Sequence, residues 1–198
     1  MEKEADKLGA KTGMWLFLYT EIMLFGGLFV IYANYYHRYT SDFIEGGAAL
    51  STITGAVNTM LLLVSSFAVA ASITAVRRNA KKAALTFLSS AILMGLLFLV
   101  NKYFEWGAKF SHGIYPGSEH LADGPQGQTV FFGLYFTITG LHGLHVLIGM
   151  VLLTVCAVLV SKDRIHQANY LVLDNSGLYW HLVDLIWIFI FPLFYLIL

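Results

Sequence analysis

Five long apolar stretches constrain this chain more than any other feature of its sequence. They lie at about residues 13–36, 54–76, 83–107, 128–160 and 177–198. Each is long enough for a helix to cross the hydrocarbon core of a bilayer, which takes about 20 residues. None alternates in the way a barrel strand does, and a bilayer admits only helices and closed barrels. The sequence therefore predicts an all-α fold, an integral membrane bundle of five transmembrane helices that forms a single domain over residues 1–198.

The composition agrees with a membrane location. Of the 198 residues, 58% are hydrophobic and 12% are charged, which is about half the charged fraction of a typical soluble domain. The formal net charge of zero gives no sign of a nucleic-acid partner, and we expect none. The single cysteine, Cys156, lies in an apolar run, so we expect a buried free thiol and no disulfide or cysteine-based metal cluster.

The basic residues predict how the bundle is oriented. With a cytoplasmic N-terminus, the outer side carries only Arg38, Lys102 and Lys109. The inner side then carries Lys3, Lys7, Lys11, Arg77, Arg78, Lys81, Lys82, Lys162 and Arg164. An excess of lysine and arginine on the cytoplasmic side is the usual pattern in membrane proteins. We therefore expect the N-terminus to be cytoplasmic and the C-terminus to lie outside.

An acidic residue, Glu21, stands inside the first apolar stretch, which contains nothing basic. An ionised carboxylate at the centre of a bilayer costs about 2.5–3.5 kcal/mol on insertion scales. A low dielectric disfavours the charged form, so we expect Glu21 to hold a proton unless it is paired. We interpret it as a buried acid that stores or relays a proton, or that holds local water and lipid in place near a proton-uptake path.

Six further polar residues within the stretches form an expected structural polar network: Asn58, Glu105, His142, His145, His181 and Asp184. His181 stands one helical turn before Asp184 on the same face, so the two side chains are expected to pair within their helix. Glu105 is expected to reach the membrane interface from the outer end of its helix. Glu21 and Asp184 are each expected about two turns from the cytoplasmic end of a helix.

His142 and His145 raise the question of a haem or copper site. Two histidines on one helix cannot both be axial ligands of a single haem, because those ligands lie on opposite faces of the porphyrin. A copper site needs a third ligand, and His181 is the only candidate on another helix. We therefore expect no metal site, and hydrogen bonds between helices instead. Four glycines of the same stretch would let neighbouring backbones approach closely: Gly133, Gly140, Gly143 and Gly149.

Motifs of self-contained enzymes are missing from the sequence. It has no phosphate-binding loop, no His-Glu-x-x-His zinc motif and no nucleophile elbow. We expect no catalytic residue in this chain. The sequence thus indicates a membrane bundle that works inside a larger complex.

Several of these segments resemble subunit III of the haem-copper oxidases. Residues 132–149, which read FGLYFTITGLHGLHVLIG, are similar to the signature helix of that family, and residues 179–187, YWHLVDLIW, are similar to its closing helix. The acidic helix of the family is similar to residues 21–29, EIMLFGGLF. Its second and third helices are similar to the segments that begin at Asn58 and that contain Phe104-Glu105-Trp106. The resemblance covers almost the whole chain in the right order.

This resemblance implies a non-redox accessory subunit that packs directly against subunit I, with subunit II in the same complex. It implies roles in assembly, stability and proton uptake, with Glu21 at the position of the family's buried carboxylate. The haems and copper are expected in the partner subunits, and no cofactor is expected in this chain. The complex as a whole would then be the oxygen-reducing, proton-translocating enzyme, and the chain a multi-pass protein of the bacterial inner membrane, in contact with lipids.

The resemblance leaves the type of oxidase open. Glu21 and the stretch from Phe104 to Pro116 favour a cytochrome c oxidase of the five-helix bacterial form. A quinol oxidase or a nitric-oxide-reductase-associated relative is the alternative. A bound phospholipid is also left open, because we expect the chain to lack two additional N-terminal helices that form a lipid-holding cleft in some members. An alternative of another class is a haem-b membrane anchor of a quinone-linked dehydrogenase, with His145 and His181 as its candidate ligand pair.

Overall fold

A computed structural model of the chain describes the backbone of residues 2–197 and the side chains of residues 8–119, 121 and 123–197. Its long helices are α1 (Glu2–Arg38), α3 (Thr52–Arg77), α4 (Lys81–Ser111), α6 (Gln126–Ser161) and α7 (Leu171–Tyr195). Within the described residues there is no strand. All five are long and apolar enough to cross a membrane. The predicted all-α architecture with five candidate membrane spans is therefore confirmed.

The helices begin and end at different residues from the apolar stretches. Four of them extend past the predicted bounds, because apolarity marks the part of a helix that lies in hydrocarbon and not its hydrogen-bonded ends. At the start of α3, for example, the Ser51 hydroxyl accepts a hydrogen bond from the amide of Thr54 at 3.3 Å and thereby caps the helix. The last helix begins six residues earlier than predicted, at Leu171, and ends at Tyr195.

Two short helices, α2 (Thr40–Ala48) and α5 (Glu119–Ala122), lie in the connections. The sequence analysis missed both, because four to nine residues carry too little periodicity to predict a helix. Asp42 of α2 accepts a hydrogen bond from the amide of Gly127 in the first turn of α6 at 3.1 Å. This carboxylate satisfies a free N–H at the start of α6 and fixes α2 against it.

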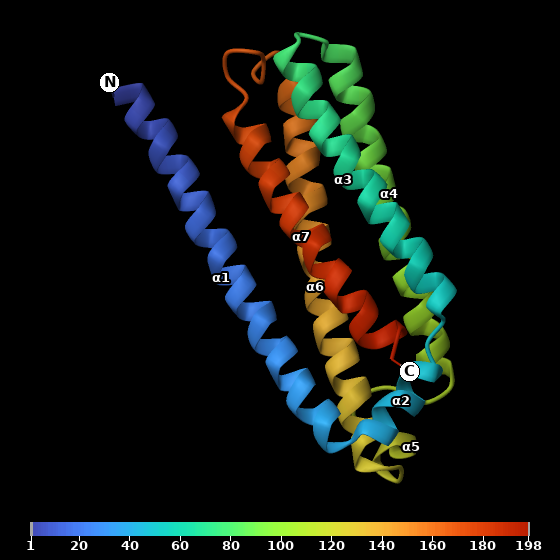
Figure 1. Ribbon diagram of the computed structural model, residues 1–198. Coiled ribbons are helices and arrows are strands. Elements are labelled where there is room, and N and C mark those ends of the chain that lie inside the picture. Colours follow the sequence, from blue (N-terminus) through green and yellow to red (C-terminus); the bar gives the residue numbers. More distant parts are fainter. Residues whose placement is uncertain (1, 198) are drawn as a thin grey trace.

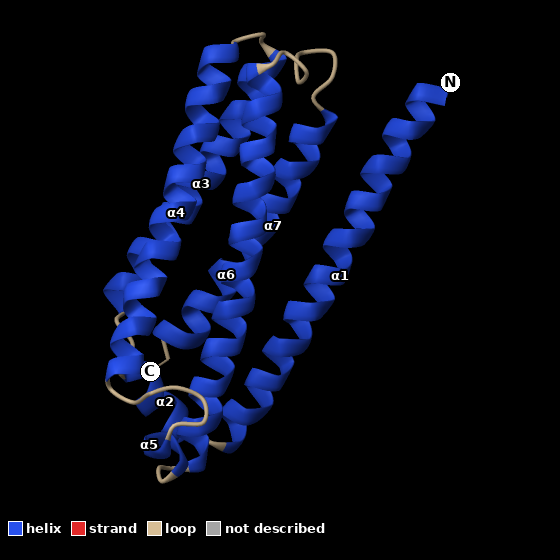
Figure 2. Ribbon diagram, turned by 180° about the vertical axis from the view of Figure 1, so that it is seen from behind, coloured by secondary structure: helices blue, strands red, loops and turns tan. Residues whose placement is uncertain are grey.

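Four of the long helices, α3, α4, α6 and α7, run side by side, whereas α1 leans away from them towards its N-terminus (Figures 1 and 2). In the most apolar segment of α7, 56% of the segment is buried by the rest of the chain. The corresponding share for the most apolar segment of α1 is 11%. Helix α7 is thus the centre of the bundle. Helix α1 is its most exposed member and touches α2, α6 and α7.

Two tryptophans of α7, both fully buried, tie this central helix to α3. The indole N–H of Trp180 donates to the Ser65 hydroxyl at 3.0 Å, and that of Trp187 donates to the Thr59 hydroxyl at 3.0 Å. Both indoles thereby fill the core without leaving their donors unsatisfied.

The glycines of α6 differ in what they face. A Cβ at Gly149 would lie 2.6 Å from the Trp180 ring, and one at Gly140 would lie 3.1 Å from the Trp106 ring. Close packing is therefore confirmed at these two positions. The nearest atom to a Cβ at Gly143 would be a methyl carbon at 3.9 Å, which is ordinary contact, and nothing lies within 4 Å of one at Gly133. For Gly133 the predicted packing role within this chain is wrong, because no other helix approaches the position of its Cβ.

We expect Gly149→Ala to lower the free energy of unfolding of the full chain by about 1–3 kcal/mol, because the added methyl group collides with a buried indole. Gly133→Ala is the matched control on the same helix, and it should leave the stability unchanged or slightly raised, since alanine favours the helix. Unfolding in lipid–detergent mixtures, followed by tryptophan fluorescence, measures both. Equal losses for the two variants would contradict the packing of Trp180 against Gly149.

Candidate functional site

The acid of the first helix is paired with a histidine of α6. Oε2 of Glu21 lies 2.9 Å from Nε2 of His145, and 14% and 10% of the two side chains remain exposed. The interhelical hydrogen bond predicted for His145 is thus confirmed. Glu21 lies close to the midpoint of its apolar helix, Leu8–Arg38, and not two turns from its end, because the helix begins before residue 13. Asp184 likewise lies near the middle of α7.

The other ring nitrogen of His145 determines how many protons this pair holds. Nδ1 lies 2.7 Å from the backbone oxygen of Leu141. A carbonyl only accepts hydrogen bonds, so Nδ1 carries a hydrogen. The contact with Glu21 then requires one proton between Nε2 and Oε2, either on an imidazolium or on a carboxylic acid. In both forms the pair has no net charge and holds a single shared proton near the middle of the membrane.

His142 behaves differently, although it is only three residues away. Its side chain is fully buried, and neither ring nitrogen has a hydrogen-bond partner. Its ring lies 5.5 Å from that of Phe98 and 5.1 Å from that of Trp187, measured between centroids. The hydrogen bond between helices that we predicted for His142 is therefore wrong. The residue faces the aromatic core between α4 and α7, whereas His145 faces α1.

A second polar cluster joins α4, α6 and α7. The Lys102 ammonium group donates to the hydroxyl of Tyr135 at 2.9 Å, to that of Tyr195 at 2.8 Å and to Oε2 of Glu105 at 3.3 Å. Both tyrosine hydroxyls donate to Oε1 of Glu105 at 2.6 Å. All three ammonium hydrogens therefore have acceptors, and the cluster is a closed network without net charge, which is the condition for burying such a pair.

This cluster overturns the expectation for Glu105 and shows an unexpected burial of Lys102. Glu105 does not reach the membrane interface, since only 8% of its side chain is exposed. Lys102, which the orientation argument counted on the outer side, is equally enclosed within the bundle. Sequence reasoning also missed Tyr135 and Tyr195, because aromatic residues in apolar helices are usually plain core. The available signal was the lysine three residues before Glu105, a spacing that places both charges on one face.

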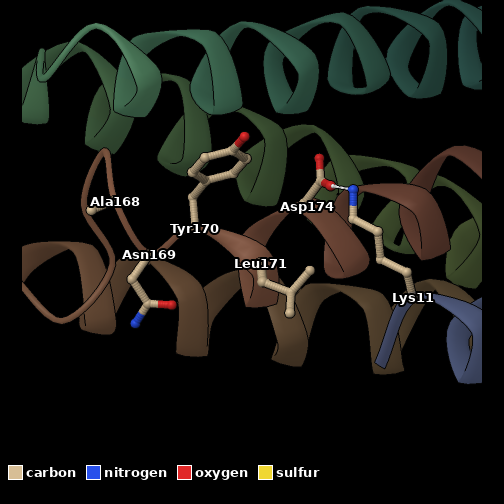
Figure 3. A pocket seen from close by; sticks show the side chains of 6 residues that line it. All are labelled: Lys11, Ala168, Asn169, Tyr170, Leu171 and Asp174. Carbon is tan, nitrogen blue, oxygen red and sulfur yellow. Dashed lines mark ion pairs between the residues drawn. The ribbon is translucent and has the colours of Figure 1, made fainter. Parts of the chain in front are cut away.

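Most of the other basic residues lie at one end of the bundle, where α3 ends and α4 begins. A cavity of about 150 Å³ lies there. Its lining includes Lys11 and Asp174 (Figure 3), whose Nζ and Oδ2 atoms are 3.0 Å apart. Arg77 lies 3.9 Å from the same carboxylate. The ion pair ties the N-terminal half of α1 to the first turn of α7. The side chains of Lys3 and Lys7 lie outside those described, and the orientation of the termini stays a prediction.

Asn58 and the pair expected between His181 and Asp184 complete the predicted set. Asn58 is fully buried on α3 and accepts a hydrogen bond from the Asn101 amide of α4 at 2.9 Å.

His181 does not bind Asp184, because its Nδ1 lies 2.6 Å from the hydroxyl of Ser66 on α3. Both Asp184 oxygens are enclosed without a hydrogen-bond partner. The pairing within α7 is therefore wrong, since a serine of the neighbouring helix binds the imidazole instead.

The histidines do not converge on a common ligand position. Among the residues whose side chains are described, no three His, Cys, Asp or Glu side chains could hold a metal ion together. His145 faces α1 through Glu21, and His181 faces α3 through Ser66. Ligation of one haem by this pair would require both rings to leave their present partners.

Comparison with known proteins places this geometry in a family. Residues 2–197 match the family described as cytochrome c oxidase subunit III. A probable quinol oxidase subunit 3 of Staphylococcus saprophyticus is 29% identical, and the match covers 94% of this chain and 88% of that protein. A probable cytochrome c oxidase subunit 3 of Rickettsia bellii is 28% identical, over 98% of this chain and 70% of that protein. The cytochrome bo(3) ubiquinol oxidase subunit 3 of Pseudomonas aeruginosa is 29% identical, and the match covers 93% of this chain and 83% of that protein.

The matched region takes in every long helix and both buried clusters, the Glu21–His145 pair and the network around Lys102. The candidate membrane spans and the match together indicate a multi-pass membrane protein. The chain belongs to the cytochrome c oxidase subunit III family.

Proposed function

We propose that this chain is a non-redox accessory subunit of a terminal cytochrome c oxidase in a bacterial inner membrane. It packs directly against subunit I, in a complex that also contains subunit II, and its N-terminus faces the cytoplasm. Subunit I carries the haems and copper, and this chain supports assembly, stability and proton uptake. The family match over residues 2–197 supports the place in the complex.

The observation that carries the proton role is the pair of Glu21 and His145. Ionisable groups at this depth are costly, and they usually mark a functional site. The pair shares one proton, and both side chains are partly exposed. A proton held there can exchange with a neighbouring group on another subunit, whereas the closed network around Lys102 is enclosed by its own tyrosines.

A quinol oxidase is the second candidate, because subunits named for quinol oxidases in Staphylococcus saprophyticus and Pseudomonas aeruginosa match this chain as well as those of cytochrome c oxidases do. We favour the cytochrome c type on the glutamate at position 21 and the segment from Phe104 to Pro116. A tagged version of the chain allows the complex to be isolated. Reduction of that complex by cytochrome c or by a quinol then distinguishes a cytochrome c oxidase from a quinol oxidase.

Glu21→Gln tests the proton role. Glutamine can still donate a hydrogen bond to His145, but it cannot release a proton. We expect the number of turnovers before inactivation of the purified oxidase to fall roughly three- to tenfold, which corresponds to a barrier to proton uptake raised by about 0.6–1.4 kcal/mol. Oxygen consumption with saturating electron donor, followed until activity ceases, gives this number.

Glu45→Gln is the matched control, because Glu45 is an exposed carboxylate on α2. It should leave both turnover and inactivation unchanged. If Glu21→Gln also left both unchanged, the proton role would be wrong and only the structural role of the pair would remain.

Substitutions of the two α6 histidines test the non-redox assignment. His145→Phe leaves Glu21 without its partner, so we expect a loss of about 1–3 kcal/mol in the stability of the chain and weaker association with subunit I. His142→Phe replaces a ring that packs against Phe98 and Trp187 and makes no hydrogen bond, and we expect a change below about 1.5 kcal/mol. The haem spectrum of each complex should match that of the wild type, and the isolated chain should show no Soret band.

Two results would contradict this assignment. A Soret band in the isolated chain that disappears with His145→Phe would favour the haem-b anchor. Equal destabilisation by the two substitutions would show that the hydrogen bond to Glu21 contributes nothing beyond the packing of the ring.

A further inference from the structure

Asp184 is an acid that the proposed function leaves without a role. Only 3% of the residue is exposed, and both carboxyl oxygens are enclosed without a partner. The acids in the ion pairs formed by the described side chains are Glu21, Glu105, Asp163 and Asp174. An ionised carboxylate with neither a cation nor a hydrogen-bond donor is the costliest state for a buried group.

Ser66 of α3 adjoins His181 of α7. Its hydroxyl is 2.6 Å from Nδ1 of His181, and Asp184 stands one helical turn after His181 on the same face of α7, which packs against α3. A serine hydroxyl has one proton to donate and two lone pairs that accept. It can therefore accept from one of the two neighbours and donate to the other at the same time.

We propose that Asp184, Ser66 and His181 form a proton-exchange site, in which Asp184 is held as a neutral carboxylic acid. The acid O–H donates to Oγ of Ser66, the Ser66 O–H donates to Nδ1 of His181, and the ring N–H of this half-buried histidine is on Nε2. This arrangement gives the enclosed carboxyl group the partner that it otherwise lacks.

The site can release a proton with water as the only other reactant. Ser66 passes its proton to Nδ1 of His181 while it takes the proton of Asp184. The imidazolium that forms then gives its Nε2 proton to a water molecule. The products are an Asp184 carboxylate that accepts a hydrogen bond from Ser66, and a neutral His181 with its hydrogen on Nδ1. Only O–H and N–H bonds break and form, and uptake is the reverse.

Neither Asp184 nor His181 takes part in an ion pair among the described side chains. Of the ionisable groups near the middle of α1 and α6, Glu21 and His145 are bound to each other, and His142 packs against Phe98 and Trp187. The trio also differs from a hydrolytic Ser-His-Asp triad, in which the carboxylate binds the imidazole nitrogen that does not face the serine. Here Asp184 does not bind His181, so the arrangement suits proton exchange and not nucleophilic attack.

Infrared spectroscopy of the full chain in phospholipid vesicles, with aspartate ¹³C-labelled at the side-chain carboxyl group, tests the protonation state. We expect a carboxylic-acid C=O band at neutral pH that shifts with the label and is absent from Asp184→Asn. In Ser66→Ala the band should move to higher frequency, because the acid loses its hydrogen-bond acceptor. Ser72→Ala is the control, since the hydroxyl of this buried α3 serine donates to the backbone oxygen of Val69.

Exchange in D₂O tests the relay itself, through the rate at which the labelled C=O band shifts. We expect this rate to fall about tenfold in Ser66→Ala and in His181→Phe, each of which removes one hydrogen bond of the chain, and to stay unchanged in Ser72→Ala. The absence of a labelled acid band from the wild type, or exchange in Ser66→Ala as fast as in the wild type, would overturn the proposal. Neither measurement depends on turnover, so the result stands apart from that of Glu21→Gln.

Discussion

Burial of a polar group in a membrane is costly unless the group finds a partner within the protein, and this constraint accounts for the main polar contacts of the bundle. The backbone satisfies it with long helices. The side chains satisfy it across helix interfaces: Glu21 with His145 between α1 and α6, Asn58 with Asn101 between α3 and α4, and the network around Lys102 between α4, α6 and α7. Each interface thus carries a polar contact that specifies which helices are neighbours, where apolar packing alone would permit several arrangements.

The sequence predicted the helices well and their partners poorly, and both outcomes have a physical origin. Hydrophobic length is a local property, so the spans could be read from the chain. Hydrogen-bond partners are set by helix packing, which brings together residues such as Glu21 and His145, or Lys102 and Tyr195, that are far apart in sequence. The expected pair of His181 and Asp184 illustrates the difference. Local spacing permitted it, but Ser66 of another helix lies closer to the imidazole.

The two histidines of α6 show how three residues of separation change the role of a side chain. His145 turns towards α1, where its Nε2 binds Glu21, and its Nδ1 binds the backbone oxygen of Leu141. His142 turns towards Phe98 and Trp187 and acts as an aromatic core residue. A motif of two histidines therefore indicated the right helix for the site. It did not indicate which histidine binds Glu21, because that depends on the face each presents to its neighbours.

Three acids within the apolar helices of this bundle are neutralised in three different ways. Glu105 pairs with a lysine and two tyrosines, and all its partners are enclosed with it. Glu21 shares a proton with His145 at a partly exposed position. Asp184 has no cation, and in our proposal keeps its own proton through Ser66. The capacity to exchange protons follows from this difference: a lysine pair holds its charges in place, whereas an acid next to an imidazole or a hydroxyl can give its proton up. In our proposals, the chain thus combines a closed polar network at one end of α7 with exchangeable protons near the middle of the bundle.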